Sequence, residues 1–251
     1  MPVSITINNV TAGYDRHPVV HHLSGSFADA SLTAVAGPNG GGKSTLLKAL
    51  VGFVPLMTGR IDFGGIKPDE IAYLPQQFEI DRTFPISVID VVLLGNWSRT
   101  GAFAPMGKLH RKEALDALAE VDMAAFASRP VVSLSTGQWQ RVLFARIIVQ
   151  RARLILLDEP FAAIDGHTTL ELMQQLKQWC RNGVTIICVM HDLNLVRAHF
   201  PQSLLLSREL IAWGSTADVL SQENLEAALE RRGSWQESLE RCAINGEERS
   251  A

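Results

Sequence analysis

The chain has 251 residues, and 47% of them are apolar, which is enough for one large domain or for one domain with a subdomain. Its 23 basic and 26 acidic residues give a formal net charge of −3, so the composition predicts no nucleic acid partner. Three widely spaced cysteines without a CxxC pair indicate reduced thiols in a cytosolic protein rather than a disulfide framework.

Nothing in the sequence predicts a segment that crosses a membrane. The longest apolar runs, such as LILL and TIICVM, have the length of strands and fall short of the ~20 residues that a membrane-spanning helix requires. The first ten residues, MPVSITINNV, lack the basic and apolar regions of a signal peptide. We therefore expect the chain to work at a membrane only where a partner holds it.

Strand-like and helix-like patterns follow one another along the chain. The first quarter reads as short strands around one glycine-rich loop and a helix from about 43 to 52. Residues 87–129 change to helical spacing, as in SVIDVVLLG and KLHRKEALDALAEV. After Gln138, apolar strands within RLILL, TIICVM and SLLLS alternate with helices. This alternation predicts an α/β core with a parallel sheet covered on both faces, interrupted by a helical insert.

These patterns divide the chain into a main domain, residues 1–220, and a polar C-terminal extension, residues 221–251. The helical insert of the main domain covers about 87–137. Within the extension, QENLEAALERR predicts a helix, and the last few residues are expected to be loose. The sequence leaves open whether the extension serves regulation or solubility.

The stretch GPNGGGKST, between a buried-looking strand and a helix, fits the phosphate-loop pattern G-x-x-x-x-G-K-[ST]. Its glycines let backbone N–H groups surround phosphate oxygens, Lys43 supplies a positive charge, and Ser44 offers a hydroxyl to Mg²⁺. The residues predicted to contact the nucleotide are Gly37, Pro38, Asn39, Gly40, Gly41, Gly42, Lys43, Ser44 and Thr45.

Two acids end the apolar strand in RLILLDEP. Carboxylates at the C-terminal end of a parallel strand face the crevice where ligands bind. We expect Asp158 to hold Mg²⁺ and Glu159 to polarise the water that attacks the γ phosphate. A structural alternative is that one of these acids caps the following helix.

A second glycine-containing turn, SLSTGQWQR, opens another helix and predicts a second anion site on backbone N–H groups.

Together these motifs resemble those of the ATP-binding subunits of ABC transporters, from about residue 3 to about residue 220. GPNGGGKST resembles the Walker A motif, LILLDEP the Walker B motif, and LSTGQ the family signature, usually LSGGQ. The resemblance implies a P-loop NTPase core of the ABC ATPase type, with an N-terminal antiparallel β subdomain and an inserted α-helical subdomain. It also implies ATP and Mg²⁺ as cofactors.

The resemblance assigns roles to further residues. AYLPQ resembles the Q-loop, whose glutamine has a catalytic role and binds the metal. Either Gln76 or Gln77 could be this glutamine, and the preceding YLP favours Gln76. VMHD resembles the switch segment, with His191 on the γ phosphate. AAID resembles the D-loop, with Asp165 among the nucleotide-binding residues. Tyr14 stands where the family stacks an aromatic ring on adenine.

The resemblance also explains why one chain carries two phosphate-binding turns. In the family, two copies pair head to tail, and each ATP lies between the Walker A motif of one copy and the signature of the other. This implies an ATP-dependent homodimer in which Ser135, Gly137 and Gln138 reach the nucleotide of the partner copy. Thr136 replaces the first glycine of the usual signature, but Gly137 remains, so we expect an active ATPase.

The segment after Gln76, FEIDRTFPISVIDVVLLGNW, is similar to that in the ATPase subunits of bacterial zinc and manganese importers. This implies that the chain powers uptake of a divalent metal ion, zinc first, from the cytoplasmic face of the membrane. Its partners would be integral membrane permease subunits and, indirectly, an extracytoplasmic metal-binding protein. The alternatives are an iron or iron-chelate importer, a soluble ABC-type ATPase and a nucleotide sensor without turnover.

Overall fold

The computed structural model describes residues 4–15, 17–76, 82–101 and 106–231, and these fall into two compact units. Of the described residues, the first unit comprises 4–5, 27–32 and those within 63–189, and the second comprises those within 6–26, 33–62 and 190–231. In the part of the chain that the structure describes, we find no helix that is both long and apolar enough to span a bilayer.

The first unit contains three parallel strands in the order β5-β6-β7, namely β5 (Ile71–Leu74), β6 (Leu154–Asp158) and β7 (Thr185–Val189). Leu74 pairs with Leu157 and Asp158 pairs with Val189, so the three strands end at the same edge. Every residue of β6 and β7 is buried, as expected for apolar strands covered on both faces.

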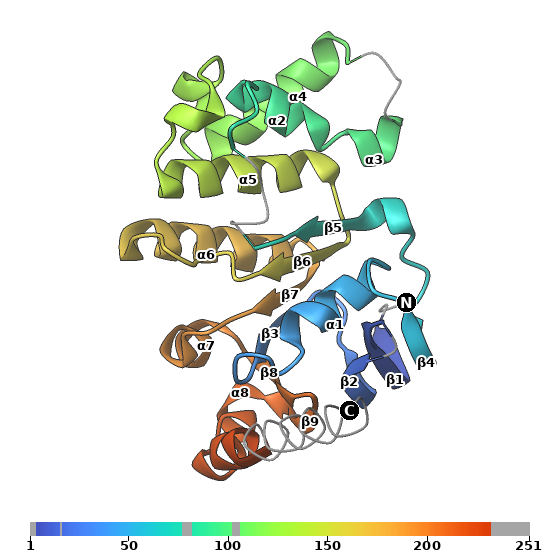
Figure 1. Cartoon of the computed structure of the whole chain (residues 1–251). Coiled ribbons are helices and arrows are strands. Elements are labelled where there is room, and N and C mark those ends of the chain that lie inside the picture. Colours follow the sequence, from blue (N-terminus) through green and yellow to red (C-terminus); the bar gives the residue numbers. More distant parts are fainter. Residues whose placement is uncertain (1–3, 16, 77–81, 102–105, 232–251) are drawn as a thin grey trace, which may run out of the picture. The chain divides into compact units, whose positions relative to one another are not determined.

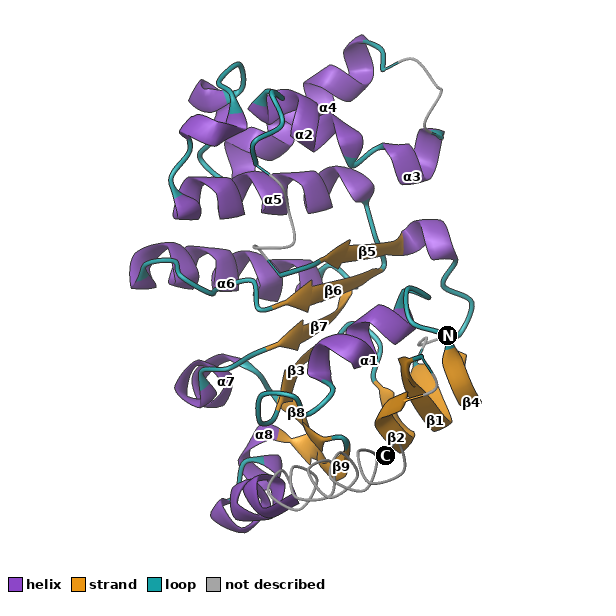
Figure 2. Ribbon diagram, viewed as in Figure 1, coloured by secondary structure: helices purple, strands orange, loops and turns teal. Residues whose placement is uncertain are grey.

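Helices make up the rest of the first unit (Figures 1 and 2). The α-helices are α2 (Val88–Leu94), α3 (Trp97–Thr100), α4 (Lys108–Glu120), α5 (Thr136–Gln150) and α6 (Gly166–Arg181). Short 3₁₀ turns lie at Pro68–Glu70, Ala124–Phe126 and Val131–Ser133. Helices α2, α4 and α5 pack on one another, and a Cβ on Gly95 would lie 2.4 Å from the carbonyl oxygen of Arg146. Glycine therefore lets the end of α2 approach α5 closely.

The second unit contains two groups of strands. One is a three-stranded sheet in the order β2-β1-β4, formed by β1 (Ile5–Tyr14), β2 (His17–Phe27) and β4 (Leu56–Asp62), with β1 antiparallel to β4. The other consists of β3 (Leu32–Ala36), β8 (Gln202–Ser207) and β9 (Glu209–Ser215). Strand β8 is parallel to β3 and antiparallel to β9. The helices are α1 (Lys43–Leu50), α7 (Leu193–His199) and α8 (Thr216–Val219), followed by a helix at residues 222–231.

The predicted fold class is confirmed, because the chain combines an antiparallel sheet, a parallel and mixed set of strands and a helical region. The structure corrects several element boundaries. Among the short strands expected in the first quarter, the first is a long strand that runs to Tyr14, and another lies at Leu56–Asp62, after the helix. Strand β9 was not predicted, because each of its residues is half-buried and its sequence, ELIAWGS, shows no alternation of apolar and polar positions.

Candidate functional site

The predicted site residues form two groups, one in each unit. In the second unit the phosphate loop (residues 37–45) joins β3 to α1, the arrangement that its motif requires. Lys43 is 5% exposed, and its Nζ donates hydrogen bonds to the carbonyl oxygens of Gly37, at 2.9 Å, and Pro38, at 3.0 Å. Helix α1 begins after Gly42 without a side-chain cap. An ammonium group and uncapped N–H groups at a helix N-terminus can together hold an anion.

At three positions of the phosphate loop, neighbouring atoms leave no room for a side chain, so only glycine fits. A Cβ on Gly37 would lie 1.9 Å from the carbonyl oxygen of Leu206, and one on Gly41 would lie 2.8 Å from the same atom. A Cβ on Gly42 would lie 2.9 Å from Cγ2 of Val20. The loop therefore lies directly against β8 and β2, and its glycines allow this contact as well as the approach of a phosphate.

Tyr14 and His191 belong to the same unit as the phosphate loop. Tyr14 ends β1 and is 47% exposed, and the strand that follows the β1–β2 turn carries Val20, which contacts the loop. The N–H of Met190 donates to the carbonyl oxygen of Val35 at 3.1 Å, so His191 emerges beside the end of β3, from which the phosphate loop also starts. The His191 side chain is exposed.

In the first unit, Gln76, Asp158 and Glu159 lie at the edge where β5 and β6 end. Asp158 is the last residue of β6 and is 1% exposed. Nε2 of Gln76 donates a hydrogen bond to Oε1 of Glu159 at 2.6 Å. Glu159 has a φ of 51°, a left-handed conformation that is unusual for a residue with a Cβ and that often marks functional positions. Carboxylates placed in this way can hold a hard cation and orient a water.

Cys188 lies on β7, next to the carboxylates of the first unit. Its side chain is fully buried, and burial, reinforced by the charge of Asp158, raises the pKa of its thiol well above the usual value. Burial also raises the pKa of Cys180 to about 11. Both thiols therefore stay protonated at neutral pH; Cys242 lies outside the described residues.

The signature segment, LSTGQ at residues 134–138, opens α5. Ser135 caps the helix: its Oγ accepts from the N–H of Gln138 at 3.2 Å, and its own N–H donates to Oε1 of Gln138 at 3.0 Å. Thr136 is the first helical residue, so a β-branched side chain fits where the family usually has glycine. A Cβ on Gly137 would lie 3.6 Å from Oδ2 of Asp165, which is an ordinary contact distance. Packing within this chain therefore does not require a glycine at 137.

Asp165 caps α6, because its Oδ1 accepts from the N–H of Thr168 at 2.9 Å. This hydrogen bond is the main cause that lowers the pKa of the Asp165 carboxyl. The carboxylate is therefore charged at neutral pH and fixes the start of α6, beside the signature segment.

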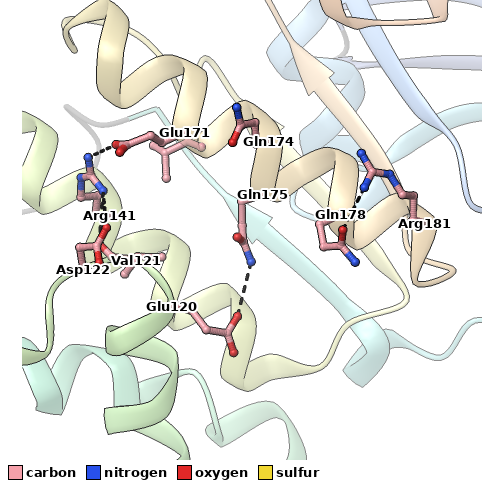
Figure 3. A pocket seen from close by; sticks show the side chains of 10 residues that line it. Glu120, Val121, Asp122, Arg141, Glu171, Gln174, Gln175, Gln178 and Arg181 are labelled. Atoms are coloured by element: carbon pink, nitrogen blue, oxygen red, sulfur yellow. Dashed lines mark hydrogen bonds and ion pairs between the residues drawn. The ribbon is translucent and has the colours of Figure 1, made fainter.

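One residue that the sequence analysis did not single out, Arg141, joins these elements. It lies one turn after the signature segment, and its side chain is 16% exposed. Nη2 pairs with Glu171 and donates to Oγ1 of Thr168 at 3.4 Å, while Nη1 donates to the carbonyl oxygen of Val121 at 3.4 Å and lies 3.9 Å from Oδ2 of Asp122. Figure 3 shows Arg141, Asp122 and Glu171 together at one side of a cavity of about 550 Å³ that they help to line. Sequence could have suggested Arg141 only through its position after the signature segment.

We expect Arg141→Ala to lower the free energy of unfolding by about 2 kcal/mol, because several acceptors, one of them charged, lose their donor. For a chain of this size the melting temperature should fall by about 4–8 °C. Arg181→Ala is the matched control, because Arg181 lines the same cavity but is exposed and donates to Gln178 one turn before it on α6. Equal melting temperatures for the two variants, measured by circular dichroism, would contradict the linking role.

Comparisons with known proteins agree with this geometry. Residues 20–162 match the sequence profile described as ABC transporter. The chain is 40% identical over 229 residues to the manganese transport system ATP-binding protein MntB of Listeria innocua, covering 89% of this chain and 95% of that protein. It is 37% identical over 229 residues to the zinc transport system ATP-binding protein TroB of Treponema pallidum, covering 90% of this chain and 86% of that protein.

Solved structures of the same kind superpose well on the chain. An inward-facing ABC transporter of the metal-chelate type gives a TM-score of 0.82 with 31% identity, over 92% of this chain and 90% of that one. The dimeric ATP-binding cassette MJ0796, bound to ADP and phosphate, gives a TM-score of 0.72 with 26% identity, over 84% of this chain and 98% of that one. On its sequence, its fold and its phosphate loop, the chain belongs to the ABC transporter family and is an ATP-hydrolysing, nucleotide-binding member of it.

Proposed function

We propose that this chain hydrolyses ATP to power the uptake of a divalent metal ion, zinc or manganese, through a membrane permease. The observation that carries the choice of cargo is similarity over about nine-tenths of the chain to ATP-binding proteins named for manganese and for zinc transport. The segment FEIDRTFPISVIDVVLLGNW supports the same class, although residues 77–81 within it lie outside the described residues. The sequence analysis favoured zinc, and the relatives named for manganese give that ion equal standing.

We assign the binding of a nucleotide with Mg²⁺ to residues of both groups. We assign the phosphates to the backbone of the phosphate loop and to Lys43, and the adenine ring to Tyr14. Ser44, Gln76 and Asp158 offer the oxygen ligands that Mg²⁺ prefers. When bound, Mg²⁺ supplies positive charge that neutralises the phosphate oxygens.

The reaction itself is assigned to Glu159. As a carboxylate, Glu159 accepts a proton from the attacking water, and the hydrogen bond from Gln76, at 2.6 Å, holds its Oε1 in place. We assign to His191 a hydrogen bond to the γ phosphate. Asp165 completes the set at the start of α6, where it is fixed by its cap.

The signature segment is assigned to the nucleotide of a second copy of the chain. Packing inside the chain does not require Gly137 to be a glycine, and we attribute the glycine to the close approach of the partner copy's nucleotide. Ser135, Gly137 and Gln138 stand at the start of α5, where backbone N–H groups can meet an anion. The dimeric form of the related cassette supports a head-to-tail homodimer that ATP brings together.

The complete transporter would contain two copies of this chain on the cytoplasmic face of the membrane, held there by permease subunits, with an extracytoplasmic metal-binding protein delivering the ion. We assign the contact with the permease to residues 91–109, where an apolar helix gives way to glycine, proline and aromatic residues; of these, 102–105 lie outside the described residues. Trp97, on α3, is 47% exposed and Leu109, on α4, is 66% exposed, which supports a contact surface in this region.

The proposal predicts the metal content of cells grown in metal-poor medium. A strain that lacks the chain should lose zinc or manganese, measured element by element by mass spectrometry of washed cells. The wild-type chain and the surface control Lys112→Ala should restore that element, whereas Glu159→Gln should not, because transport requires hydrolysis. A fall in iron alone would show that the transported ion is iron and not zinc or manganese. Unchanged levels of all elements would overturn the import function.

A further inference from the structure

The polar C-terminal extension begins with a helix, residues 222–231, that we call the extension helix. We propose that the extension helix positions the phosphate loop for nucleotide binding, acting through the β8–β9 turn, residues 206–209. This inference rests on the proposed nucleotide site and adds to it a set of positioning residues, Ser207, Glu209 and Arg231. All of them, and the phosphate loop, belong to the second unit.

One side of the β8–β9 turn contacts the phosphate loop through its backbone. The carbonyl oxygen of Leu206 fills the space beside Gly37 and Gly41, where no Cβ could fit. The N–H of Arg208 donates to the carbonyl oxygen of Gly41 at 2.8 Å, and the carbonyl oxygen of Arg208 accepts from the N–H of His21, on β2, at 2.8 Å. The path of the phosphate loop is therefore set in part by where the turn lies.

The other side of the turn is held by the extension helix through side chains. Oγ of Ser207, which is 2% exposed, donates to the carbonyl oxygen of Ala228 at 3.0 Å. Ala228 is itself 2% exposed. Nη1 of Arg231 lies 2.7 Å from Oε2 of Glu209, and both of these side chains are about half exposed. Two of the four turn residues thus contact the extension helix through their side chains.

The contacts alternate along the turn, so the extension helix can influence the position of the phosphate loop through it. Side chains at 207 and 209 face the extension helix, while the backbone at 206 and 208 faces the phosphate loop. Arg208 has a φ of 60°, a strained conformation for a residue with a Cβ, and such conformations persist only where surrounding contacts impose them. Loss of the contacts from the extension helix should let the turn relax, and the hydrogen bond to Gly41 would then be formed in only a fraction of molecules.

If the binding-competent form is only partly populated, the apparent Kd for nucleotide rises by the inverse of that fraction. We expect Ser207→Ala combined with Arg231→Ala to raise the Kd of the full chain for a fluorescent ATP analogue with Mg²⁺ by about tenfold, with smaller rises for each single variant. The KM for ATP should rise similarly, while kcat at saturating ATP stays within twofold of the wild type. A loss of overall stability alone would not raise KM while leaving kcat nearly unchanged.

A variant with the charges of the Glu209–Arg231 ion pair exchanged distinguishes a positioning role from a general loss of stability. Glu209→Arg with Arg231→Glu should return the Kd to within twofold of the wild type, because the ion pair forms again with its charges reversed. Glu226→Ala is the matched control, since Glu226 lies on the same helix and accepts from Gln222 one turn before it. If the double alanine variant does not fold, the half-exposed Arg231→Ala variant carries the test.

The inference is overturned if Arg231→Ala and Ser207→Ala both bind the analogue like the wild type, or if kcat falls while KM is unchanged. Lys43→Ala, measured alongside, distinguishes this failure from failure of the nucleotide site itself. If Lys43→Ala loses binding while Arg231→Ala and Ser207→Ala bind normally, only the positioning role of the extension helix is overturned. Normal binding by Lys43→Ala would remove the site on which the inference rests.

Discussion

Lys43→Ala should weaken the binding of ATP by about 100-fold, the largest effect on affinity that we expect from a single side chain. The Lys43 ammonium is buried in the phosphate loop, and its Nζ already lies 2.9 Å from one loop carbonyl oxygen and 3.0 Å from another. These bonds hold the positive charge where phosphates would bind. Titration of the chain with a fluorescent ATP analogue and Mg²⁺ measures the effect.

The control for this variant is Lys112→Ala, which removes an exposed lysine from α4 and should leave the affinity unchanged. Lys43→Ala also removes the donor from the carbonyl oxygens of Gly37 and Pro38, so its melting temperature is measured without nucleotide. A folded Lys43→Ala chain that binds ATP with wild-type affinity would show that the loop does not hold the phosphates.

Glu159→Gln should lower the rate of ATP hydrolysis by at least about 100-fold, the contribution expected from a general base, and should leave ATP binding intact. The amide is nearly the same size as the carboxylate and keeps an oxygen that can accept the hydrogen bond from Gln76, so the geometry of the site is preserved. What the amide loses is the ability to accept a proton from water. Phosphate release by the assembled transporter measures the rate.

A chain that binds ATP but cannot hydrolyse it should also accumulate as a dimer, which gel filtration with ATP detects. Glu120→Gln, an exposed acid at the end of α4, is the matched control and should behave like the wild type in both measurements. Hydrolysis by Glu159→Gln at the wild-type rate would mean that another group accepts the proton.

The parts of the site that sequence could predict are those in which residue type carries the chemistry. The glycines and Lys43 of the phosphate loop are recognisable because only glycine permits the backbone path and only a cation meets the phosphates. The two acids at the end of β6 are recognisable because a charged pair directly after four apolar residues is unusual in a buried strand. The α/β core and its helical insert followed from the alternation of apolar strands and helices, whereas the ABC ATPase type and the antiparallel β subdomain followed from the family resemblance.

Contacts made by the backbone leave no such trace in the sequence. The hydrogen bond from Arg208 to Gly41 uses an N–H group that nearly every residue has, and it joins positions far apart in the chain. Arg141 was missed for a related reason, because its acceptors come from α6 and from the segment after α4, and only the folded chain brings them together. Strand β9 lacks an alternating pattern because it is half-buried along its whole length.

The burial of Cys188 has a consequence for a protein proposed to raise the zinc or manganese content of the cell. Zinc binds strongly to thiolates, and a thiolate beside Asp158 could have captured the imported ion at the ATPase centre. The Cys188 thiol is closed to solvent and remains protonated. Because Cys188 is fully buried, its sulfur is closed to metal ions and oxidants in the surrounding solution.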